Sequence, residues 1–350
     1  MDQISRILDS NKIPEEDSDH ELSLRPAHLD EFIGQKKITD NLKVFIESAK
    51  LRKKSLDHIL LSGPPGLGKT TLAFIIAQEL GVNLKATSAP IIDKAGDLAS
   101  ILTGLEEHDV LFIDEIHRLS PAIEEILYPA MEDRSIDIII GQGIGAKSIK
   151  LNLASFTLVG ATTRTGLLTA ALRDRFGIPL RLNYYEPEDL KKIASRTAGI
   201  IGIEMDDDAA LEIAKRSRRT PRIVNRLVRR VADFTTVMKH KKIDIETTKY
   251  SLKRLDIDEL GLDEMDRRIL TSIIEKYNGG PVGLKTIAIS VGEETDTLED
   301  YYEPFLVQIG LLKRTPRGRM VTANAYKHLG IELTRIAEDN QQILFDEDTN

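Results

Sequence analysis

Short apolar runs alternate with longer helical patterns in the first half of the chain. The runs cover residues 59–61, 110–113 and 157–159. Each is almost entirely apolar, as expected of parallel strands that are covered by helices on both faces. The alternation predicts an α/β domain around a parallel sheet. Two further strand-like runs around three glycines, within residues 137–153, predict a β-hairpin.

The second half of the chain changes character twice. A region of helical patterns comes first, in which Thr220 before Pro221 is typical of a helix start. Three amphipathic patterns then precede two strand-like pieces around the turn 315–318, which is the order of a winged helix. We predict a flexible lead-in over residues 1–20 and a large α/β domain over residues 21–184. A small helical domain that serves as a lid follows over residues 185–256, then a winged-helix domain over residues 257–335 and an acidic tail over residues 336–350.

Composition narrows the classes of function. The formal net charge of −8 is unlike that of a protein that coats nucleic acid or anionic lipid, so any DNA contact must come from a local basic patch. The chain has no cysteine, which excludes disulfides and cysteine-ligated zinc. No apolar run approaches the ~20 residues that cross a bilayer, and the acidic N-terminus is unlike a signal peptide. We expect a cytoplasmic protein without membrane contact.

Residues 63–70 read Gly-Pro-Pro-Gly-Leu-Gly-Lys-Thr and match the phosphate-binding pattern G-x-x-x-x-G-K-[ST]. They follow a predicted strand and precede a helical run, which is the context that this chemistry needs. The glycines let backbone N–H groups turn toward phosphate oxygens, and the following helix adds its positive end. Lys69 should reach the β- and γ-phosphates, and the Thr70 hydroxyl should ligate Mg²⁺. We therefore expect ATP and Mg²⁺ as ligands.

Two further strand ends carry candidate catalytic groups. Asp114 and Glu115 follow a buried strand, where Asp114 would hold Mg²⁺ through water and Glu115 would activate the attacking water. Alone, such a pair is more often an exposed acidic strand end. Thr163 follows the strand at 157–159 and is the candidate for positioning the water. A simple strand-end cap is an equally good interpretation of Thr163.

Arginines complete the predicted site. Arg175 stands in Leu-Arg-Asp-Arg-Phe at 172–176, and an arginine from a neighbouring subunit can contribute ~10³–10⁵ in rate by neutralising charge on the γ-phosphate. This role requires an oligomer, and the alternative is an ion pair with Asp174. Arg222 would lie in the first turn of the helix that starts at the Thr-Pro pair, within reach of phosphates. A solvated helix face explains most of the basic stretch 215–230.

In this order, the motifs resemble an AAA+ module, and the chain is similar to the RuvB family of bacterial Holliday-junction branch-migration motors. The resemblance runs from about residue 24 to 330, over stretches 24–26, 32–35, 63–71, 112–117, 128–133, 160–164, 172–177, 185–187 and 314–319. It implies an ATP-hydrolysing homo-hexamer that pumps double-stranded DNA through Holliday junctions in recombination and repair. It also implies a RuvA-type junction-binding partner and, as a further partner, a junction-cleaving nuclease.

The resemblance also assigns further residues. Those that would line the nucleotide pocket are Leu24, Arg25, Gly66, Leu67, Gly68, Lys69, Thr70, Thr71, Tyr185 and Arg222. Those that would contact nucleotide across a subunit interface are Glu132, Asp133, Arg134 and Arg175. Ile144, near the tip of the predicted hairpin, matches the arm that grips RuvA. An exposed apolar side chain there suits a partner anchor, and the alternative is an ordinary buried loop residue.

The predicted winged helix raises the question of how it meets DNA. Its third helical pattern is acidic, which disfavours insertion into a groove. The resemblance points instead to Arg314 and Arg319 on the wing, where contacts to phosphates bind DNA without reading its sequence. The alternative is a solvated charged turn. Where some relatives have an additional DNA-contacting arginine, this chain has Thr295. One fewer phosphate contact would lower the salt slope, which is the steepness with which the logarithm of the DNA-binding constant falls with the logarithm of the salt concentration, by about 1.

Two other functions compete with the DNA motor. A clamp-loader or helicase-loader subunit would also bind ATP, but typically carries Ser-Arg-Cys and a collar domain in place of the Arg-Asp-Arg-Phe and winged helix found in this chain. A winged-helix transcription regulator with a nucleotide-sensing domain would need a helix that reads sequence, and the acidic third helix argues against it.

Overall fold

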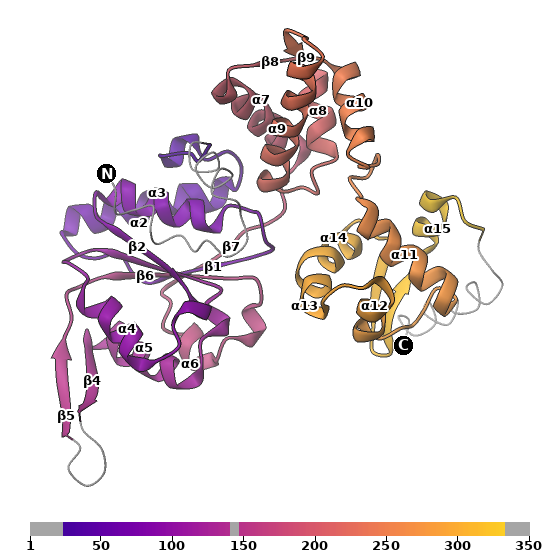
Figure 1. Cartoon of the computed structure of the whole chain (residues 1–350). Coiled ribbons are helices and arrows are strands. Elements are labelled where there is room, and N and C mark those ends of the chain that lie inside the picture. The colour runs from indigo at the N-terminus through magenta and orange to yellow at the C-terminus, as the bar shows by residue number, and fades with distance from the viewer. Residues whose placement is uncertain (1–23, 141–146, 333–350) are drawn as a thin grey trace. The chain divides into compact units, whose positions relative to one another are not determined.

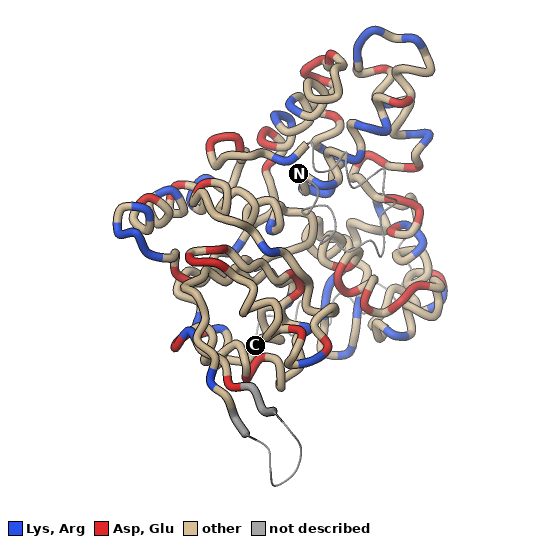
Figure 2. The backbone as a smooth tube through the Cα atoms, turned by 60° about the vertical axis from the view of Figure 1, so that its left-hand side comes forward, with Lys and Arg blue, Asp and Glu red and all other residues tan. Residues whose placement is uncertain are grey.

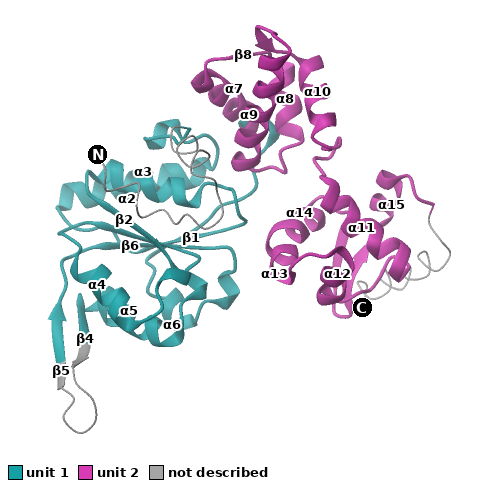
Figure 3. Cartoon of the chain, in the orientation of Figure 1, with its two compact units in different colours: residues 1–189 teal, residues 190–350 magenta. Residues whose placement is uncertain are grey.

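A computed structural model gives the fold of the chain and describes residues 24–140 and 147–332. The chain divides into two compact units, Met1–Asp189 and Leu190–Asn350 (Figure 3). Basic and acidic residues are interspersed along the described backbone of each unit (Figure 2). In the part of the chain that the structure describes, no helix combines the length and the apolar character needed to cross a membrane.

Five parallel strands form the sheet of the first unit, which confirms the predicted α/β fold (Figure 1). Their order is β2-β3-β6-β1-β7. Ile59 of β1 is opposite Val159 of β6, and Val110 of β3 is opposite Thr157 of β6. Because β6 lies between β1 and β3, the residues that follow these three strands meet at one edge of the sheet. The strands span β1 (Ile59–Ser62), β2 (Leu84–Ser88), β3 (Val110–Asp114), β6 (Thr157–Thr162) and β7 (Ile178–Arg181).

Helices cover both faces of this sheet, with α2 and α3 on one face and α4, α5 and α6 on the other (Figure 1). The core under α4 and α5 includes Leu98, Leu127 and Leu158, which are fully buried. Coverage on both faces explains why the strands are apolar at successive positions. The helices are α2 (Lys36–Arg52), α3 (Lys69–Leu80), α4 (Ala95–Thr103), α5 (Pro121–Glu132) and α6 (Ala170–Arg173), and short 3₁₀ turns are η1 (Leu29–Glu31), η2 (Ala89–Ile91), η3 (Ile116–Arg118) and η5 (Thr165–Leu167).

A separate antiparallel pair confirms the predicted hairpin. β4 (Ser135–Ile140) pairs with β5 (Lys147–Asn152), and Ser135 lies opposite Asn152. The pair forms a sheet of its own beside the five-stranded sheet. Ile144, the predicted anchor for a partner, lies outside the described residues.

The second unit begins with a helical region. Its helices are α7 (Pro187–Ile201), α8 (Asp207–Lys215), α9 (Pro221–Val237) and α10 (Ile245–Arg254). Thr220 is the N-cap residue of α9 with Pro221 at the first helical position, as predicted. The sequence predicts helices only, and this is incomplete, because β8 (Glu204–Met205) and β9 (Lys242–Ile243) form a parallel pair. Strands of two residues are too short to leave a periodic pattern.

The winged helix follows in the same unit, with the predicted three helical regions and hairpin. α11 (Glu264–Tyr277) and α12 (Leu284–Val291) are continuous. The third helical region consists of α13 (Thr295–Thr297), a π-helical turn (Leu298–Tyr302) and α14 (Glu303–Gln308). Pro304 at the start of α14 lacks an N–H, which favours an irregular turn before it. The wing is β10 (Leu312–Thr315) paired with β11 (Gly318–Val321), and α15 (Ala323–Leu329) closes the described part.

Candidate nucleotide site

The predicted phosphate-binding loop connects β1 to α3. Gly66 and Gly68 have φ angles of +78° and +98°, a backbone conformation that residues with side chains rarely adopt. A Cβ on Gly68 would lie 3.3 Å from the ring of Phe32, so the loop also has no room for a side chain there. The loop opens on the positive N-terminal end of α3, where anions are stabilised. The first residues of α3 are Lys69, Thr70 and Thr71.

Lys69 is buried, and its ammonium is held inside the loop. Its Nζ donates hydrogen bonds to the carbonyl oxygens of Gly63 at 2.8 Å and Pro64 at 2.9 Å. Burial lowers the pKa of Lys69, while the negative charges of Asp114 and Glu115 act in the opposite direction. The charges of the loop and of the β3 end therefore interact across the site.

Asp114 and Glu115 lie at the carboxyl end of β3. Asp114 Oδ1 accepts a hydrogen bond from the backbone N–H of Glu115 at 2.9 Å. Glu115 has a φ angle of +49°, which is uncommon for a residue with a side chain. Burial raises the pKa of Glu115, the charge of Asp114 adds to this increase, and Lys69 opposes it. Glu115 is thus a partly buried carboxylate with a raised pKa, suited to accept a proton.

Thr163 reaches Glu115 from the end of β6. Its Oγ1 donates to Glu115 Oε2 at 3.3 Å, so the predicted neighbour of the acidic strand end does contact it. His117 also contacts this carboxylate, with Nδ1 at 3.2 Å from Oε2. No role for His117 was predicted from the sequence. Its signals were its position two residues after the Asp-Glu pair and its place in the stretch 112–117 that carries the resemblance.

Of three residues that the resemblance assigns to the pocket, Tyr185 contacts the phosphate-binding loop and Arg25 contacts the helix that follows it. Tyr185 donates from its hydroxyl to the carbonyl oxygen of Leu67 at 3.3 Å and is almost fully buried. The guanidinium of Arg25 lies 5.3 Å from the centre of the Phe74 ring on α3, and the neighbouring Leu24 is buried. All three therefore belong to the same side of the first unit as the loop or the helix that follows it.

Arg175 follows α6 and contacts α5. Its Nη2 pairs with Glu132 Oε2 at 3.2 Å, and its guanidinium lies 4.5 Å from the centre of the Tyr128 ring. The alternative partner, Asp174, is not its partner among the ion pairs of the described residues. The structure thus brings together Arg175 and Glu132, which the resemblance assigns to one subunit interface. Asp133 is the C-cap residue of α5.

A buried polar contact joins the two helices beneath Arg175. Glu124 Oε2 accepts hydrogen bonds from the hydroxyl groups of Tyr128 at 3.0 Å and Thr169 at 2.8 Å. Thr169 also caps α6 by accepting from the backbone N–H of Leu172 at 3.2 Å. No pattern along the chain predicts this contact, which holds the Tyr128 ring beside the guanidinium of Arg175.

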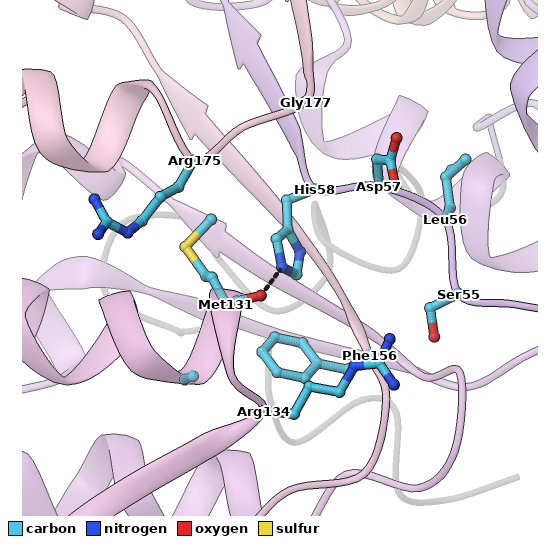
Figure 4. Close-up of a pocket in the computed structure, with 10 residues that line it drawn as sticks. Ser55, Leu56, Asp57, His58, Met131, Arg134, Phe156, Arg175 and Gly177 are labelled. Atoms are coloured by element: carbon cyan, nitrogen blue, oxygen red, sulfur yellow. Dashed lines mark hydrogen bonds between the residues drawn. The ribbon is translucent and has the colours of Figure 1, made fainter.

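A cavity of about 250 Å³ lies beside Arg175 and Arg134 (Figure 4). His58 lines it, and its Nδ1 accepts from the N–H of Leu158 at 2.8 Å while Nε2 donates to the carbonyl oxygen of Met131 at 3.2 Å. Burial lowers the pKa of His58, which favours this neutral form. Lining residues 55–58 come directly before β1. The cavity is therefore at the amino edge of the sheet, whereas the phosphate-binding loop is at the carboxyl edge.

The remaining predicted residues belong to the second unit. Arg222 is in the first turn of α9. Arg314 and Arg319 lie opposite each other on the wing, and both pair with Glu303 of α14. The side chain of Glu303 is 2% exposed, that of Arg319 is 20% exposed and that of Arg314 is 53% exposed. Glu303 was not predicted, because a pattern along the chain does not show which acid faces the wing.

Comparison with known families explains this combination of parts. Residues 24–182 match the family model "Holliday junction DNA helicase RuvB P-loop domain". Residues 185–258 match the RuvB AAA lid domain, and residues 259–330 match the RuvB C-terminal winged helix domain. The chain belongs to the RuvB family. As a RuvB homologue it is a P-loop AAA+ ATPase, and the predicted AAA+ architecture with lid and winged helix is confirmed.

Individual RuvB proteins are similar over most of their length. A curated "Holliday junction branch migration complex subunit RuvB" from Paramagnetospirillum magneticum is 55% identical over 327 residues, which cover 93% of each chain. The solved structure of the Thermotoga maritima RuvB Holliday junction branch migration motor is 54% identical, with a TM-score of 0.82 over 89% of this chain and 100% of that chain. A mutant of the Thermotoga protein gives a TM-score of 0.83 at the same identity and the same coverage.

Proposed function

We propose that this chain is the ATP-driven motor subunit of Holliday-junction branch migration. In this proposal, it works as a homo-hexameric ring that pumps duplex DNA, in recombination and repair, together with a RuvA-type junction-binding protein. The observation that carries the proposal is the meeting of Lys69, Glu115 and Thr163 at one edge of the sheet, in a chain that also has a wing with two arginines. Because bacterial DNA lies in the cytoplasm, a motor that acts on it would be cytoplasmic.

The site residues have complementary roles in ATP hydrolysis. Lys69 binds the β- and γ-phosphates and neutralises charge as the bond from the γ-phosphorus to its bridging oxygen breaks. Glu115 accepts the proton of the attacking water, and Thr163 keeps the carboxylate in position by its 3.3 Å hydrogen bond. Leu24, Arg25 and Tyr185 would hold the rest of the nucleotide beside the loop.

The oxygen ligands at the site fit Mg²⁺. The hydroxyl of Thr70 and the carboxylate of Asp114 are hard donors, which this ion prefers. Within the described ranges, no three His, Asp or Glu side chains form a metal site by themselves. Such a site suits an ion that takes its remaining ligands from water and phosphates. When bound, Mg²⁺ would neutralise charge on the β- and γ-phosphate oxygens.

The position of Arg175 supports an oligomer. Arg175 lines a cavity with the residues that precede β1, whereas the phosphate-binding loop follows β1. Four strand residues at about 3.3 Å each put roughly 13 Å between these two edges of the sheet. Arg175 is therefore too far from the phosphates of its own chain and would act on ATP held by a neighbour. Glu132, Asp133 and Arg134 would contribute to the same interface.

Contacts to DNA and to partners complete the proposal. Arg314 and Arg319 would contact phosphates, which suits a motor that must move along any sequence. Arg222 would sense the nucleotide from the lid. The hairpin of β4 and β5, with Ile144 in the sequence that connects the two strands, would bind the RuvA-type protein, and a junction-cleaving nuclease would join the complex. The domain limits would be 21–184, 185–256 and 257–335.

A four-way junction assay tests this function. Junctions with homologous arms, labelled on one strand, are incubated with the chain and ATP, with and without a RuvA-type protein. We expect ATP-dependent conversion into duplexes that the partner accelerates. A matched reaction with a non-hydrolysable ATP analogue should give no conversion. Equal conversion with the analogue, or no conversion with the partner present, would contradict a branch-migration motor.

A further inference from the structure

The backbone after β3 brings His117 back toward the acidic strand end. Glu115, with its φ of +49°, starts the 3₁₀ turn η3, and the N–H of Arg118 donates to the carbonyl oxygen of Glu115 at 2.8 Å. This tight turn returns the side chain of His117 to the side chain two residues before it. The side chain of His117 is only 5% exposed. A buried imidazole therefore lies directly against the carboxylate that would activate water.

The imidazole contacts groups on two different strand ends. Nδ1 of His117 lies 3.2 Å from Oε2 of Glu115 and 3.0 Å from Oγ1 of Thr162, the last residue of β6. A carboxylate oxygen only accepts hydrogen bonds, so donation to Glu115 requires the proton on Nδ1, and Thr162 Oγ1 is then a second acceptor beside it. Thr162 Oγ1 also accepts the backbone N–H of Arg164 at 3.0 Å, which fixes the hydroxyl in place. The ring orientation is thus set by β6.

Close packing between η3 and β6 lets His117 contact Thr162. Gly160 of β6 faces η3, and a Cβ on it would lie 2.9 Å from Cδ1 of Ile116 and 3.0 Å from the ring of Phe176. An alanine at this position would require the side chains of Ile116 and Phe176 to shift. The glycine therefore permits the approach that brings His117 to Thr162.

Two neighbours of the carboxylate lie on the same oxygen. Thr163 donates to Oε2 of Glu115 at 3.3 Å, and Nδ1 of His117 lies 3.2 Å from Oε2. Two contacts on Oε2 restrain the carboxylate, so Oε1 would take the proton of the attacking water.

We propose that His117 is a positioning residue for ATP hydrolysis, which aims Glu115 by donating from Nδ1 to Oε2 while Thr162 holds the imidazole. This inference rests on the proposed function, because it assumes that Glu115 activates water. It assigns His117 no contact with ATP. Its removal should therefore change turnover and leave nucleotide binding in place.

Two variants of His117 separate the two ring nitrogens. In His117→Asn, the amide nitrogen takes the place of Nδ1, whereas in His117→Gln it takes the place of Nε2. We expect His117→Ala and His117→Gln to lower kcat for ATP roughly 10- to 100-fold, since a misplacement of about 1 Å can cost about 100-fold. His117→Asn should restore most of this loss. KM, and the affinity for a fluorescent ATP analogue, should stay within about threefold.

A combination with Glu115→Gln tests whether His117 acts through the carboxylate. The double variant Glu115→Gln/His117→Ala should hydrolyse ATP at the rate of Glu115→Gln alone. Thr162→Val keeps the volume, removes the hydroxyl and should lower kcat as well. It serves as the second variant if circular dichroism shows that His117→Ala is not folded. An unchanged kcat in folded His117→Ala or in Thr162→Val, a loss confined to KM, or no difference between His117→Asn and His117→Gln overturns the proposal.

The same measurements separate this inference from the proposed function. If Glu115→Gln loses hydrolysis and His117→Ala keeps it, only the role of His117 is wrong. If Glu115→Gln keeps full hydrolysis, the assignment of the whole site is wrong.

Discussion

Arg218, in the turn between α8 and α9, donates hydrogen bonds from Nη2 to the carboxylate of Asp266 in the first turn of α11. The same nitrogen lies 2.6 Å from Oδ2 of Asp263. The side chain of Asp266 is 0% exposed and that of Arg218 is 6% exposed. Aromatic rings of Tyr301, Tyr302 and Phe305 lie 5.2, 5.7 and 5.4 Å from the guanidinium carbon. This buried pair joins the helical region to the winged helix.

Loss of this arginine should destabilise the second unit. Above pH 7, where Asp266 is ionised, Arg218→Ala leaves its carboxylate buried without its cation, which typically costs about 3 kcal/mol or more. The matched control is Arg230→Ala, which removes an exposed pair with Asp233 at 2.9 Å and should cost less than about 1 kcal/mol. Chemical denaturation of the full chain measures both. Equal effects of the two substitutions would mean that burial adds nothing to the Arg218 pair.

Stability should also depend on pH through Asp266. Burial raises the pKa of Asp266 to about 7 from its ordinary 3.8, because the attraction of Arg218 offsets only part of the cost of burying the charge. Between these values the folded state keeps a proton that the unfolded state releases, so this group stabilises at low pH and its contribution is lost as pH rises to about 7. Melting temperatures of the chain and of Asp266→Asn from pH 4.5 to 8 check this. A parallel dependence in both proteins would exclude Asp266 as the cause.

Substitutions at the nucleotide site should separate binding from hydrolysis. Glu115→Gln keeps the phosphate-binding loop and should bind ATP while hydrolysing it at least about 100-fold more slowly, since a general base contributes about 10²–10⁴. Lys69→Ala should lose both, because it removes the ammonium inside the loop. A binding assay with a fluorescent analogue and a phosphate-release assay distinguish the two. Normal turnover in either variant would show that hydrolysis occurs elsewhere.

Mixed oligomers should regain activity if Arg175 acts on a neighbour. Arg175→Ala subunits keep the phosphate-binding loop, and Lys69→Ala subunits keep the arginine. Each should be inactive alone, and a mixture should form some complete sites, with hydrolysis well above the sum of the separate reactions. Different affinity tags on the two variants control for mixing. No recovery in oligomers shown to contain both variants would assign Arg175 to its own chain.

The wing should bind DNA in competition with Glu303. Arg314→Ala should weaken duplex binding regardless of sequence and reduce the salt slope by about 1. Glu303→Gln removes the charge that pairs with both arginines, so it should strengthen duplex binding, and the effect should vanish when Arg314 and Arg319 are also alanine. Fluorescence anisotropy over a salt series measures these changes. Unaltered affinity in Arg314→Ala would remove the wing from the DNA contact.

The sequence predicts the parts of this molecule that depend on local pattern. The strand at 110–113 and the loop that ends in Lys69 are defined by neighbours along the chain, so both were predictable. Glu303 and His117 were not, because their partners come from the wing and from β6, and no local pattern encodes such pairs. Arg218 was hidden for the same reason, within a basic stretch that reads as a solvated helix face.

The joint made by Arg218 has a mechanical consequence. Arg218 precedes Arg222 by four residues, and Arg222 starts the helix that would sense the nucleotide. The side chain of Arg218 pairs with Asp266 in α11, the first helix of the domain that carries the wing. A tilt of α9 driven by ATP would thus be passed to the DNA grip with little slack. ATP turnover would then displace the winged helix, because the buried Arg218–Asp266 pair couples it rigidly to the helical region.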